Sequence, residues 1–284
     1  MYSLTHAWKV HMPYASANDA EIYFTDSGGP GPALILSHGF LMDSSMFDKQ
    51  REHLAQGNRI LQYDARGHGA TREYSTHTDF DYWDQAADLL AVLDAAGVDQ
   101  ASVGGMSQGG FIALRAALLA PSRVQSLILI ATTACSSTTE ENTGYKALFE
   151  SWMSDLPLRP IAESLAPQLI GGTSHDQELW IERWMTSDRN RIRASAKCLM
   201  DRDSVVHRLG EINCPVTIIR GEDDQSFRRA HAELLHRALV NSTGIEDIPG
   251  AGHAVNWTHA EPVNVAIESF LRRTDQRLGN FTPR

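Results

Sequence analysis

Long apolar runs and a basic leader are both missing from this sequence. No stretch approaches the roughly 18 consecutive apolar residues that a membrane-spanning helix needs. The N-terminal segment, Met1–Lys9, has no basic stretch followed by an apolar one, the pattern that marks a secretory signal peptide. The sequence therefore favours neither a membrane protein nor a secreted one, and we expect a cytoplasmic protein.

Cysteine is scarce and widely spaced. The chain has three cysteines, Cys135, Cys198 and Cys214, so an even-numbered disulfide framework and a cysteine-based metal site are both disfavoured. The 12 histidines include no His-Glu-x-x-His pattern. We therefore predict free thiols, no metal and no other cofactor.

Positive charge is also in short supply. Lys and Arg number 25 against 35 for Asp and Glu, which gives a net charge of −10. A surplus of negative charge repels phosphate backbones and anionic lipid surfaces. The composition argues against nucleic acid and membrane partners, and it leaves a small molecule as the expected ligand.

The chain contains enough apolar residues to form the core of one large domain. It is 284 residues long and 42% hydrophobic, which suits a single α/β domain with an inserted subdomain. Apolar or alternating runs typical of strands and stretches with helical spacing follow one another along the chain. The predicted strands are 21–25, 33–37, 59–63, 101–103, 124–130, 216–220 and 245–248, and the predicted helices are 45–55, 81–96, 111–119, 227–239 and 261–272. This alternation predicts an α/β fold with a mostly parallel, doubly wound sheet.

The alternation stops between residues 133 and 203. This stretch is richer in polar, Trp and Met residues and contains no clear buried strand, so we expect several helices. The predicted organisation is a core domain made of residues 1–132 and 204–284, with a helical lid inserted at 133–203.

The most informative motif is Gly-x-Ser-x-Gly at Gly105, Ser107 and Gly109. It lies between a predicted buried strand and an alanine-rich helical run. A serine on such a sharp strand-to-helix turn projects as a nucleophile, and glycines on either side let the backbones approach closely. The motif alone also fits a glycine-rich turn with an idle serine.

Two further motifs follow predicted strands. Asp223 and Asp224 come after the strand at 216–220, and His253 follows the strand at 245–248 in a glycine-flanked loop. A carboxylate there could orient an imidazole, which could then reach Ser107 as a base. Either aspartate fits this role on position alone.

The segment Ser37-His38-Gly39-Phe40 follows the buried strand at 33–37. The backbone N–H of Phe40 could point into the site and, with that of Gln108, form a two-donor oxyanion hole. His38 and the similarly placed His68 are expected to structure their loops rather than to catalyse.

Two other sets of residues complete the expected site. Asp64 and Arg66 are interpreted as a structural loop pair. Phe40 and Met106 flank the predicted reaction centre, so they are candidates to line the pocket. Aromatic rings could contribute too, although a lid also needs large side chains for its own core. The candidates are Trp152, Trp180, Trp184 and Trp257.

Taken together, these motifs resemble those of the α/β-hydrolase superfamily over nearly the full chain, in the same order of nucleophile, acid and base. The resemblance favours Asp224 over Asp223, because the family spacing is Gly-x-x-Asp. Within the superfamily, the segments at 66–69, 105–110 and 253–257 are similar to the enol-lactonase, small-esterase and cofactor-free haloperoxidase branch. A serine nucleophile disfavours dehalogenases and epoxide hydrolases, and Phe40 in place of a Gly-Pro-Gly run disfavours carbon–carbon-bond hydrolases and proline iminopeptidases.

The resemblance implies a serine hydrolase that cleaves a carboxylic ester or lactone of a small, largely apolar substrate without a cofactor. Two alternatives stay open. The same serine could form a peracid, as in cofactor-free haloperoxidases and perhydrolases, or the fold could serve as a non-catalytic receptor for a small molecule.

Overall fold

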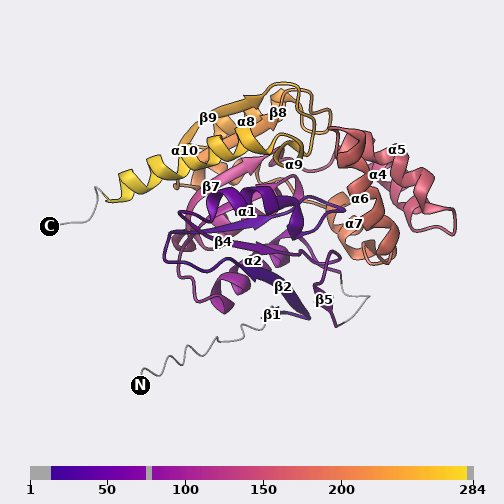
Figure 1. Cartoon of the computed structure of the whole chain (residues 1–284), viewed down its shortest axis with the longest axis horizontal. Helices are drawn as coiled ribbons and strands as arrows, with labels where there is room; N and C mark the ends of the chain where they lie inside the picture. Colours follow the sequence, from indigo (N-terminus) through magenta and orange to yellow (C-terminus); the bar gives the residue numbers. More distant parts are fainter. Residues whose placement is uncertain (1–13, 75–78, 280–284) are drawn as a thin grey trace, which may run out of the picture.

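A computed structural model describes residues 14–74 and 79–279 (Figure 1). The Met1–Lys9 segment considered above lies outside these residues. The described part contains a nine-stranded sheet in the order β1-β2-β4-β3-β6-β7-β8-β9, with β5 paired to β2. The strands are β1 Tyr14–Ala17, β2 Ala20–Asp26, β3 Ala33–Ser37, β4 Arg59–Tyr63, β5 Arg72–Glu73, β6 Ala101–Met106, β7 Val124–Ile130, β8 Val216–Gly221 and β9 Ser242–Ile248.

The sheet is parallel from β4 through β9 and antiparallel where β2 meets β1, β4 and β5. The predicted mostly parallel, doubly wound sheet is therefore confirmed. Strands β3, β6, β7 and β8 are almost wholly buried, which explains why apolar and small residues predominate in them. Parallel pairing also brings the loops after β3, β6 and β8 to one edge of the sheet.

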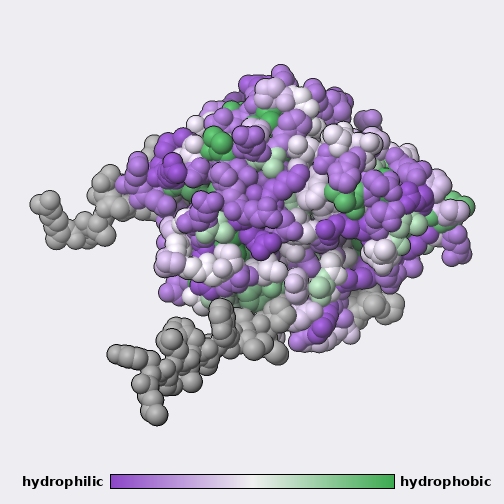
Figure 2. Space-filling model, viewed as in Figure 1, coloured by the Kyte–Doolittle hydropathy of each residue, from purple (hydrophilic) through white to green (hydrophobic). Residues whose placement is uncertain are grey.

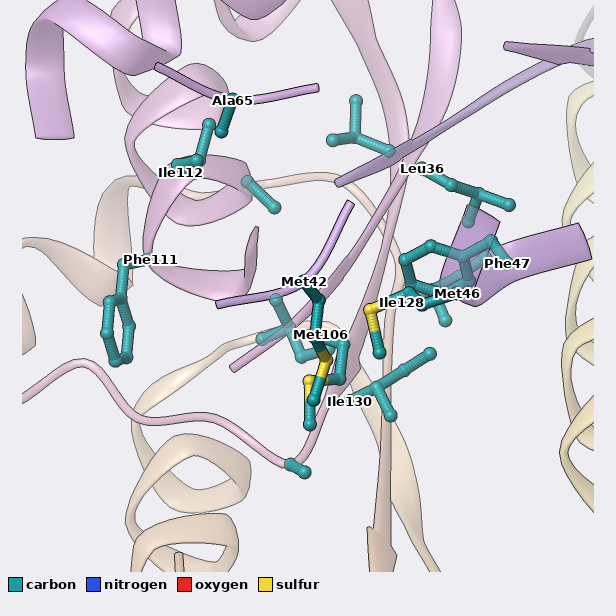
Figure 3. Close-up of a cluster of buried hydrophobic side chains, with 14 of the residues drawn as sticks. Leu36, Met42, Met46, Phe47, Ala65, Met106, Phe111, Ile112, Ile128 and Ile130 are labelled. Carbon is teal, nitrogen blue, oxygen red and sulfur yellow. The ribbon is translucent and has the colours of Figure 1, made fainter. Parts of the chain in front are cut away.

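Helices flank the sheet on both sides. Helices α2 and α3 pack together, as do α1 and α10, and Figure 3 shows Phe111 and Ile112 of α3 on one side of the central strands with Met46 and Phe47 on the other. The core helices are α1 Asp48–Leu54, α2 Tyr82–Ala95, α3 Gln108–Leu119, α8 Arg229–Ala238, α9 Val255–Thr258 and α10 Ala260–Gly279, with short 3₁₀ turns η1 Ser44–Phe47, η2 Pro121–Arg123 and η3 Val206–Glu211.

Local sequence signals set the helix ends. Helix α2 begins after Asp81, whose carboxylate accepts hydrogen bonds from the N–H groups of Trp83 and Asp84, while the Asp84 carboxylate accepts from the Asp81 N–H. This reciprocal pair is a capping box. The helix gives way to Gly97, which adopts a φ of 63°. The predicted boundaries at 81 and 96 are therefore close to those observed.

Residues 133–203, hereafter the inserted segment, lie between β7 and β8, which are neighbours in the sheet. The segment contains four helices and no strand: α4 Thr139–Trp152, α5 Leu158–Leu169, α6 Ser174–Thr186 and α7 Arg193–Met200. They gather to one side of the sheet (Figure 1), with α5 packed on α6 and α4 on α7. The predicted helical content is thus observed, and the action of this segment as a lid stays a prediction.

The surface is largely polar. Figure 2 shows hydrophilic side chains over most of the face in view, with apolar residues scattered among them. Of the helices in the described residues, none combines the length and the apolar character that a membrane span requires.

Candidate active site

Ser107 lies on the turn between strand β6 and helix α3. Its backbone has φ 55° and ψ −116°, a conformation that non-glycine residues rarely adopt. Hydrogen bonds hold it there: its N–H donates to the Ile130 carbonyl (2.9 Å), and its own carbonyl accepts from Gly110 N–H (2.9 Å) and Thr132 Oγ1 (2.7 Å). A fourth hydrogen bond runs from Phe111 N–H to the same carbonyl (3.4 Å), so both polar backbone groups of Ser107 are held in the strained turn.

The two glycines of the motif have a steric cause. A Cβ on Gly105 would lie 2.0 Å from the Gly109 carbonyl oxygen, and one on Gly109 would lie 1.9 Å from the Ser37 carbonyl oxygen. Both distances are far inside van der Waals contact with backbone atoms that cannot swing away. The turn that displays Ser107 consequently requires glycine at both positions, as the sequence predicts.

His253 and Asp224 form a buried pair at the same edge of the sheet as this turn. Asp224 follows β8 and His253 follows β9, and their Nδ1 and Oδ2 atoms are 3.0 Å apart. Both residues are at most 3% exposed. Asp223 is exposed to solvent. The structure therefore brings Asp224, rather than its neighbour, to the histidine.

The environment of Asp224 favours its ionised form. Burial alone would raise the pKa of this carboxyl, but the charge of His253, its hydrogen bond and the N–H groups of Phe227 and Ser226 outweigh burial and hold the pKa below its ordinary value. Those two amides bind Oδ1 at 3.1 and 2.8 Å. An ionised Asp224 fixes Nδ1 of His253 as the protonated nitrogen and leaves Nε2 with its lone pair.

One polar side-chain atom of Ser107 and one of His253 have no partner among the described residues. Within the described part of the chain, neither the Ser107 hydroxyl nor His253 Nε2 makes a hydrogen bond to another residue. Contacts between a nucleophile and its base are often long in ligand-free proteins and shorten when substrate binds. Ser107 is 9% exposed, so its immediate surroundings are nearly closed.

Two backbone amides near Ser107 are also unused. Phe40 follows β3, and Gln108 is the first residue of α3, where helix geometry supplies no acceptor. Across residues 14–74 and 79–279, neither N–H donates a hydrogen bond within the protein. The two predicted oxyanion donors thus have no competing partner.

The loop histidines behave as predicted. His38 hydrogen-bonds backbone groups of the loops after β3 and β4 through its two ring nitrogens. His68 Nδ1 donates to the Arg66 carbonyl (2.8 Å), and Nε2 accepts from Leu41 N–H (3.1 Å). Burial, with a smaller effect of nearby His38, lowers the pKa of His68 to about 3. A neutral His68 therefore ties the loop after β3 to the loop after β4.

The structure gives packing roles to the other predicted pocket residues. Met106 is fully buried and lies beside Met42 among core side chains (Figure 3). The Phe40 ring contacts the rings of His68 and Phe149, with centroids 5.3 and 5.2 Å away. The four tryptophans are buried in two edge-to-face pairs: Trp152 with Trp184, and Trp180 with Trp257. This packing matches the alternative of a hydrophobic core for the inserted segment, and substrate contact stays a prediction.

Two cavities lie within or against the inserted segment. One of about 530 Å³ is lined by residues of α4 and α7, including Phe149. Another of about 110 Å³ is lined by Leu41 and His68 on the core side and by Trp152 and Trp184 on the other. Neither cavity includes Ser107. In the described residues, no group of three or more His, Cys, Asp or Glu side chains is arranged to hold a metal ion.

Sequence reasoning missed the contact of Thr132 with the turn. Its hydroxyl donates to the Ser107 carbonyl, and its side chain is also the one that a Cβ on Gly110 would strike, at 2.4 Å. Thr132 follows β7, the strand next to β6, so it reaches the same edge of the sheet. The sequence signal that could have predicted this contact is a hydroxyl side chain just after an apolar strand.

The chain is similar to known proteins in sequence and in fold. The pattern of the alpha/beta hydrolase fold family matches residues 32–171. Together with the sheet topology, this match shows that the protein has the fold of the α/β-hydrolase superfamily.

Individual relatives point to one part of that superfamily. The chain is 27% identical to a non-heme haloperoxidase from Rhodococcus erythropolis, over 92% of this chain and 99% of the relative. Among solved structures, it is similar to a thermophilic esterase from Thermogutta terrifontis (TM-score 0.82, 26% identity, 92% of this chain and 97% of the other). An enol-lactonase from Burkholderia xenovorans shares the fold (TM-score 0.80, 20% identity, 92% and 100% coverage). The resemblance to this branch of the superfamily is therefore confirmed.

Proposed function

We propose that this protein is a serine hydrolase that cleaves a carboxylic ester or lactone through Ser107, His253 and Asp224. The observation that carries the proposal is the strained turn that displays Ser107 on the same sheet edge as a buried His–Asp pair. A strained backbone maintained by four hydrogen bonds and two obligatory glycines needs a function to account for its cost. Nucleophilic attack by the displayed hydroxyl is that function.

The reaction follows from the groups present. His253 Nε2 takes the proton of the Ser107 hydroxyl as its oxygen attacks the substrate carbonyl, and Asp224 stabilises the imidazolium that forms. The carbonyl oxygen becomes an oxyanion that the N–H groups of Phe40 and Gln108 bind, each worth about 3 kcal/mol in well-studied enzymes. His253 then protonates the leaving alcohol, and the acyl group stays on Ser107. Water, deprotonated by His253, releases the acid and restores the serine.

The surroundings favour a small and largely apolar substrate. The Phe227 ring lies 5.6 Å from the His253 ring, and the Phe40 ring packs against Phe149 of the inserted segment. Aromatic walls of this kind bind apolar groups and have few polar atoms to recognise charged ones. The esterase and the enol-lactonase among the similar structures are named for ester and lactone cleavage, which supports the bond class proposed here.

Steady-state hydrolysis tests the proposal. We expect the protein to hydrolyse members of a panel of aryl esters, simple lactones, enol lactones and acyl-homoserine lactones, and Ser107→Ala to remove at least about 99.9% of that activity. Ser102→Ala is the matched control, because Ser102 is a buried serine on β6, the strand that leads to Ser107, and its hydroxyl accepts a hydrogen bond from that of Ser126 (2.8 Å). Equal activity in the two variants would contradict the role of Ser107.

Perhydrolysis is the second candidate, and the similarity to a non-heme haloperoxidase favours it. Here peroxide replaces water in the second step, so that the Ser107 acyl group leaves as a peracid, which oxidises halide. Bromination that depends on both peroxide and a carboxylic acid, and that Ser107→Ala abolishes, would identify this activity. Ester hydrolysis without such bromination would restrict the protein to the first function.

A further inference from the structure

The inserted segment contacts the loop after β3 at two consecutive residues, Phe40 and Leu41. The Phe40 ring lies 5.2 Å from the Phe149 ring of helix α4. The Leu41 carbonyl accepts a 2.6 Å hydrogen bond from the indole nitrogen of Trp184 in helix α6. Both contacts fall on the stretch of backbone that carries one of the two candidate oxyanion amides.

Leu41 is strained, and side chains fix both of its polar backbone groups. Its φ is 61°, in the left-handed region that costs free energy for a branched, non-glycine residue. Its N–H donates to His68 of the core, and its carbonyl accepts from Trp184 of the inserted segment. The conformation of this residue therefore depends on one bond from each part of the molecule.

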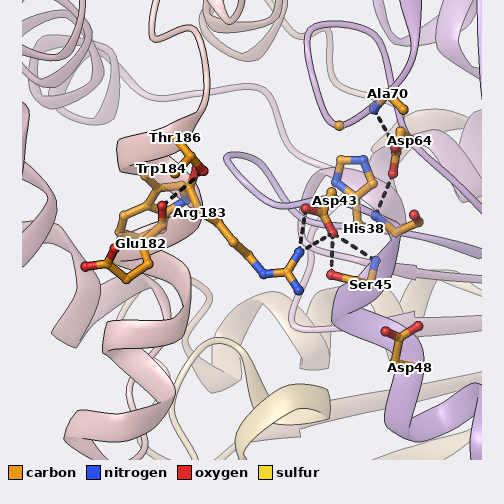
Figure 4. Close-up of polar contacts among 12 residues, drawn as sticks. His38, Asp43, Ser45, Asp48, Asp64, Ala70, Glu182, Arg183, Trp184 and Thr186 are labelled. Atoms are coloured by element: carbon orange, nitrogen blue, oxygen red, sulfur yellow. Dashed lines mark hydrogen bonds and ion pairs between the residues drawn. The ribbon is translucent and has the colours of Figure 1, made fainter.

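An ion pair reinforces the same attachment. Arg183, next to Trp184, reaches from α6 to the Asp43 carboxylate at 3.0 Å (Figure 4). Asp43 in turn accepts a hydrogen bond from Ser45 N–H at 2.9 Å and so caps the turn that ends this loop. Helix α6 is thus attached to the loop at two points, two residues apart.

We propose that Trp184 is a positioning residue for the oxyanion hole. Its indole N–H holds the Leu41 carbonyl, and through the shared backbone this keeps the Phe40 N–H aimed at the reacting carbonyl oxygen. A docked inserted segment then completes the oxyanion hole rather than merely covering the substrate. The inference rests on the proposed serine hydrolase function and adds a requirement that the core residues alone do not contain.

Trp184→Phe separates this role from simple packing. Phenylalanine retains an aromatic ring beside Trp152 but lacks the N–H. The matched control is Trp83→Phe. The indole N–H of Trp83, in core helix α2, donates a hydrogen bond to Oδ2 of Asp203, the last residue of the inserted segment, at 3.2 Å. This variant therefore also removes one indole hydrogen bond between the core and the inserted segment. The active fraction of each preparation is titrated with a fluorophosphonate, so that loss of folded protein is not counted as loss of rate.

We expect Trp184→Phe to lower kcat per active site by about five- to tenfold with KM within twofold, the effect of losing one hydrogen bond that matters in the transition state. Affinity for an arylboronic acid, which forms a tetrahedral adduct with the serine, falls by the same factor. Trp83→Phe changes neither. Arg183→Gln removes the ion pair to Asp43 at a half-exposed position, where the shorter side chain leaves no buried cavity. It lowers kcat and boronic acid affinity as well, but by a smaller factor.

Three results would overturn the inference: equal losses in the two tryptophan variants, a change confined to KM, or unchanged boronic acid affinity in Trp184→Phe. Each would occur with an active wild-type enzyme, so the proposed function would survive. A wild-type protein with no turnover of any ester or lactone would overturn the proposed function and this inference together.

Discussion

Ser107, Asp224 and His253 come from loops at the ends of core strands, whereas Trp184 and Arg183 reach the loop after β3 from a helix of the inserted segment. In the core, the backbone itself sets the geometry, through a strained turn and glycines with no room for a Cβ. In the inserted segment, the long side chains of Trp184 and Arg183 set the geometry of the contact with the core. The difference predicts that core substitutions abolish function, while substitutions in the segment adjust it.

The largest effect is expected at Asp224. Asp224→Asn keeps the size of the side chain but removes the charge that stabilises the His253 imidazolium, so we expect kcat to fall by about 10³- to 10⁴-fold. Steady-state kinetics on the best ester of the panel measure this. A loss below tenfold would show that the buried pair is structural only.

The same variant has a pH signature. The pKa of Asp224 is lower in the folded protein than its ordinary value of 3.8, so its ionised form adds stability above that value, and this stability is lost as pH falls through the folded pKa. The difference in unfolding free energy between wild type and Asp224→Asn is therefore expected to shrink on going from pH 7 to pH 3. Denaturant titrations at the two pH values check the sign, and a difference that grows would contradict it.

Glycine substitutions compare the two regions directly. Gly109→Ala forces a Cβ against the Ser37 carbonyl oxygen, so we expect a loss of about 3 kcal/mol or more in unfolding free energy. Gly144→Ala in α4 meets no atom within 4 Å, and alanine favours a helix, so a gain of about 0.5–1 kcal/mol is expected there. Similar effects at both positions, measured by urea unfolding, would remove the contrast between core and segment.

The smallest effect is expected at Arg159, on the surface of the inserted segment. Its guanidinium pairs with three glutamates, of which Glu178 is 3.1 Å away, but all partners are about half exposed. Exposed ion pairs contribute little, because water and salt screen them. Arg159→Gln should leave the thermal midpoint and kcat unresolved from wild type, and a clear drop in either would show that this surface supports the site.

The core could be predicted from sequence because its signals are local. The glycines around Ser107, the buried strands and the residues that follow those strands are adjacent in the chain, and parallel pairing then brings them to one edge. The antiparallel strands β1 and β5 escaped prediction because both are short and lie away from the buried centre of the sheet.

Contacts between distant segments left no such signal. Asp64 and Arg66 were expected to pair, but this was wrong: Arg66 binds Asp88 of α2 at 2.6 Å, and Asp64 accepts from backbone N–H groups, including that of Ser44 at 2.7 Å. A buried guanidinium pairs with whichever carboxylate the fold places beside it. Proximity in the sequence does not determine that partner. The hydrogen bond from Trp184 to the Leu41 carbonyl could not be predicted either, because the two residues are far apart in the sequence.

The most direct test of the central claim is the site at which a fluorophosphonate probe attaches to the intact protein. The probe reacts only with a serine activated by a neighbouring base, and peptide mass spectrometry locates the adduct. The strained turn and the buried pair predict one adduct, on Ser107, that forms quickly in the wild type and not in Ser107→Ala. Attachment at another serine, or no attachment to the folded protein, would contradict the account.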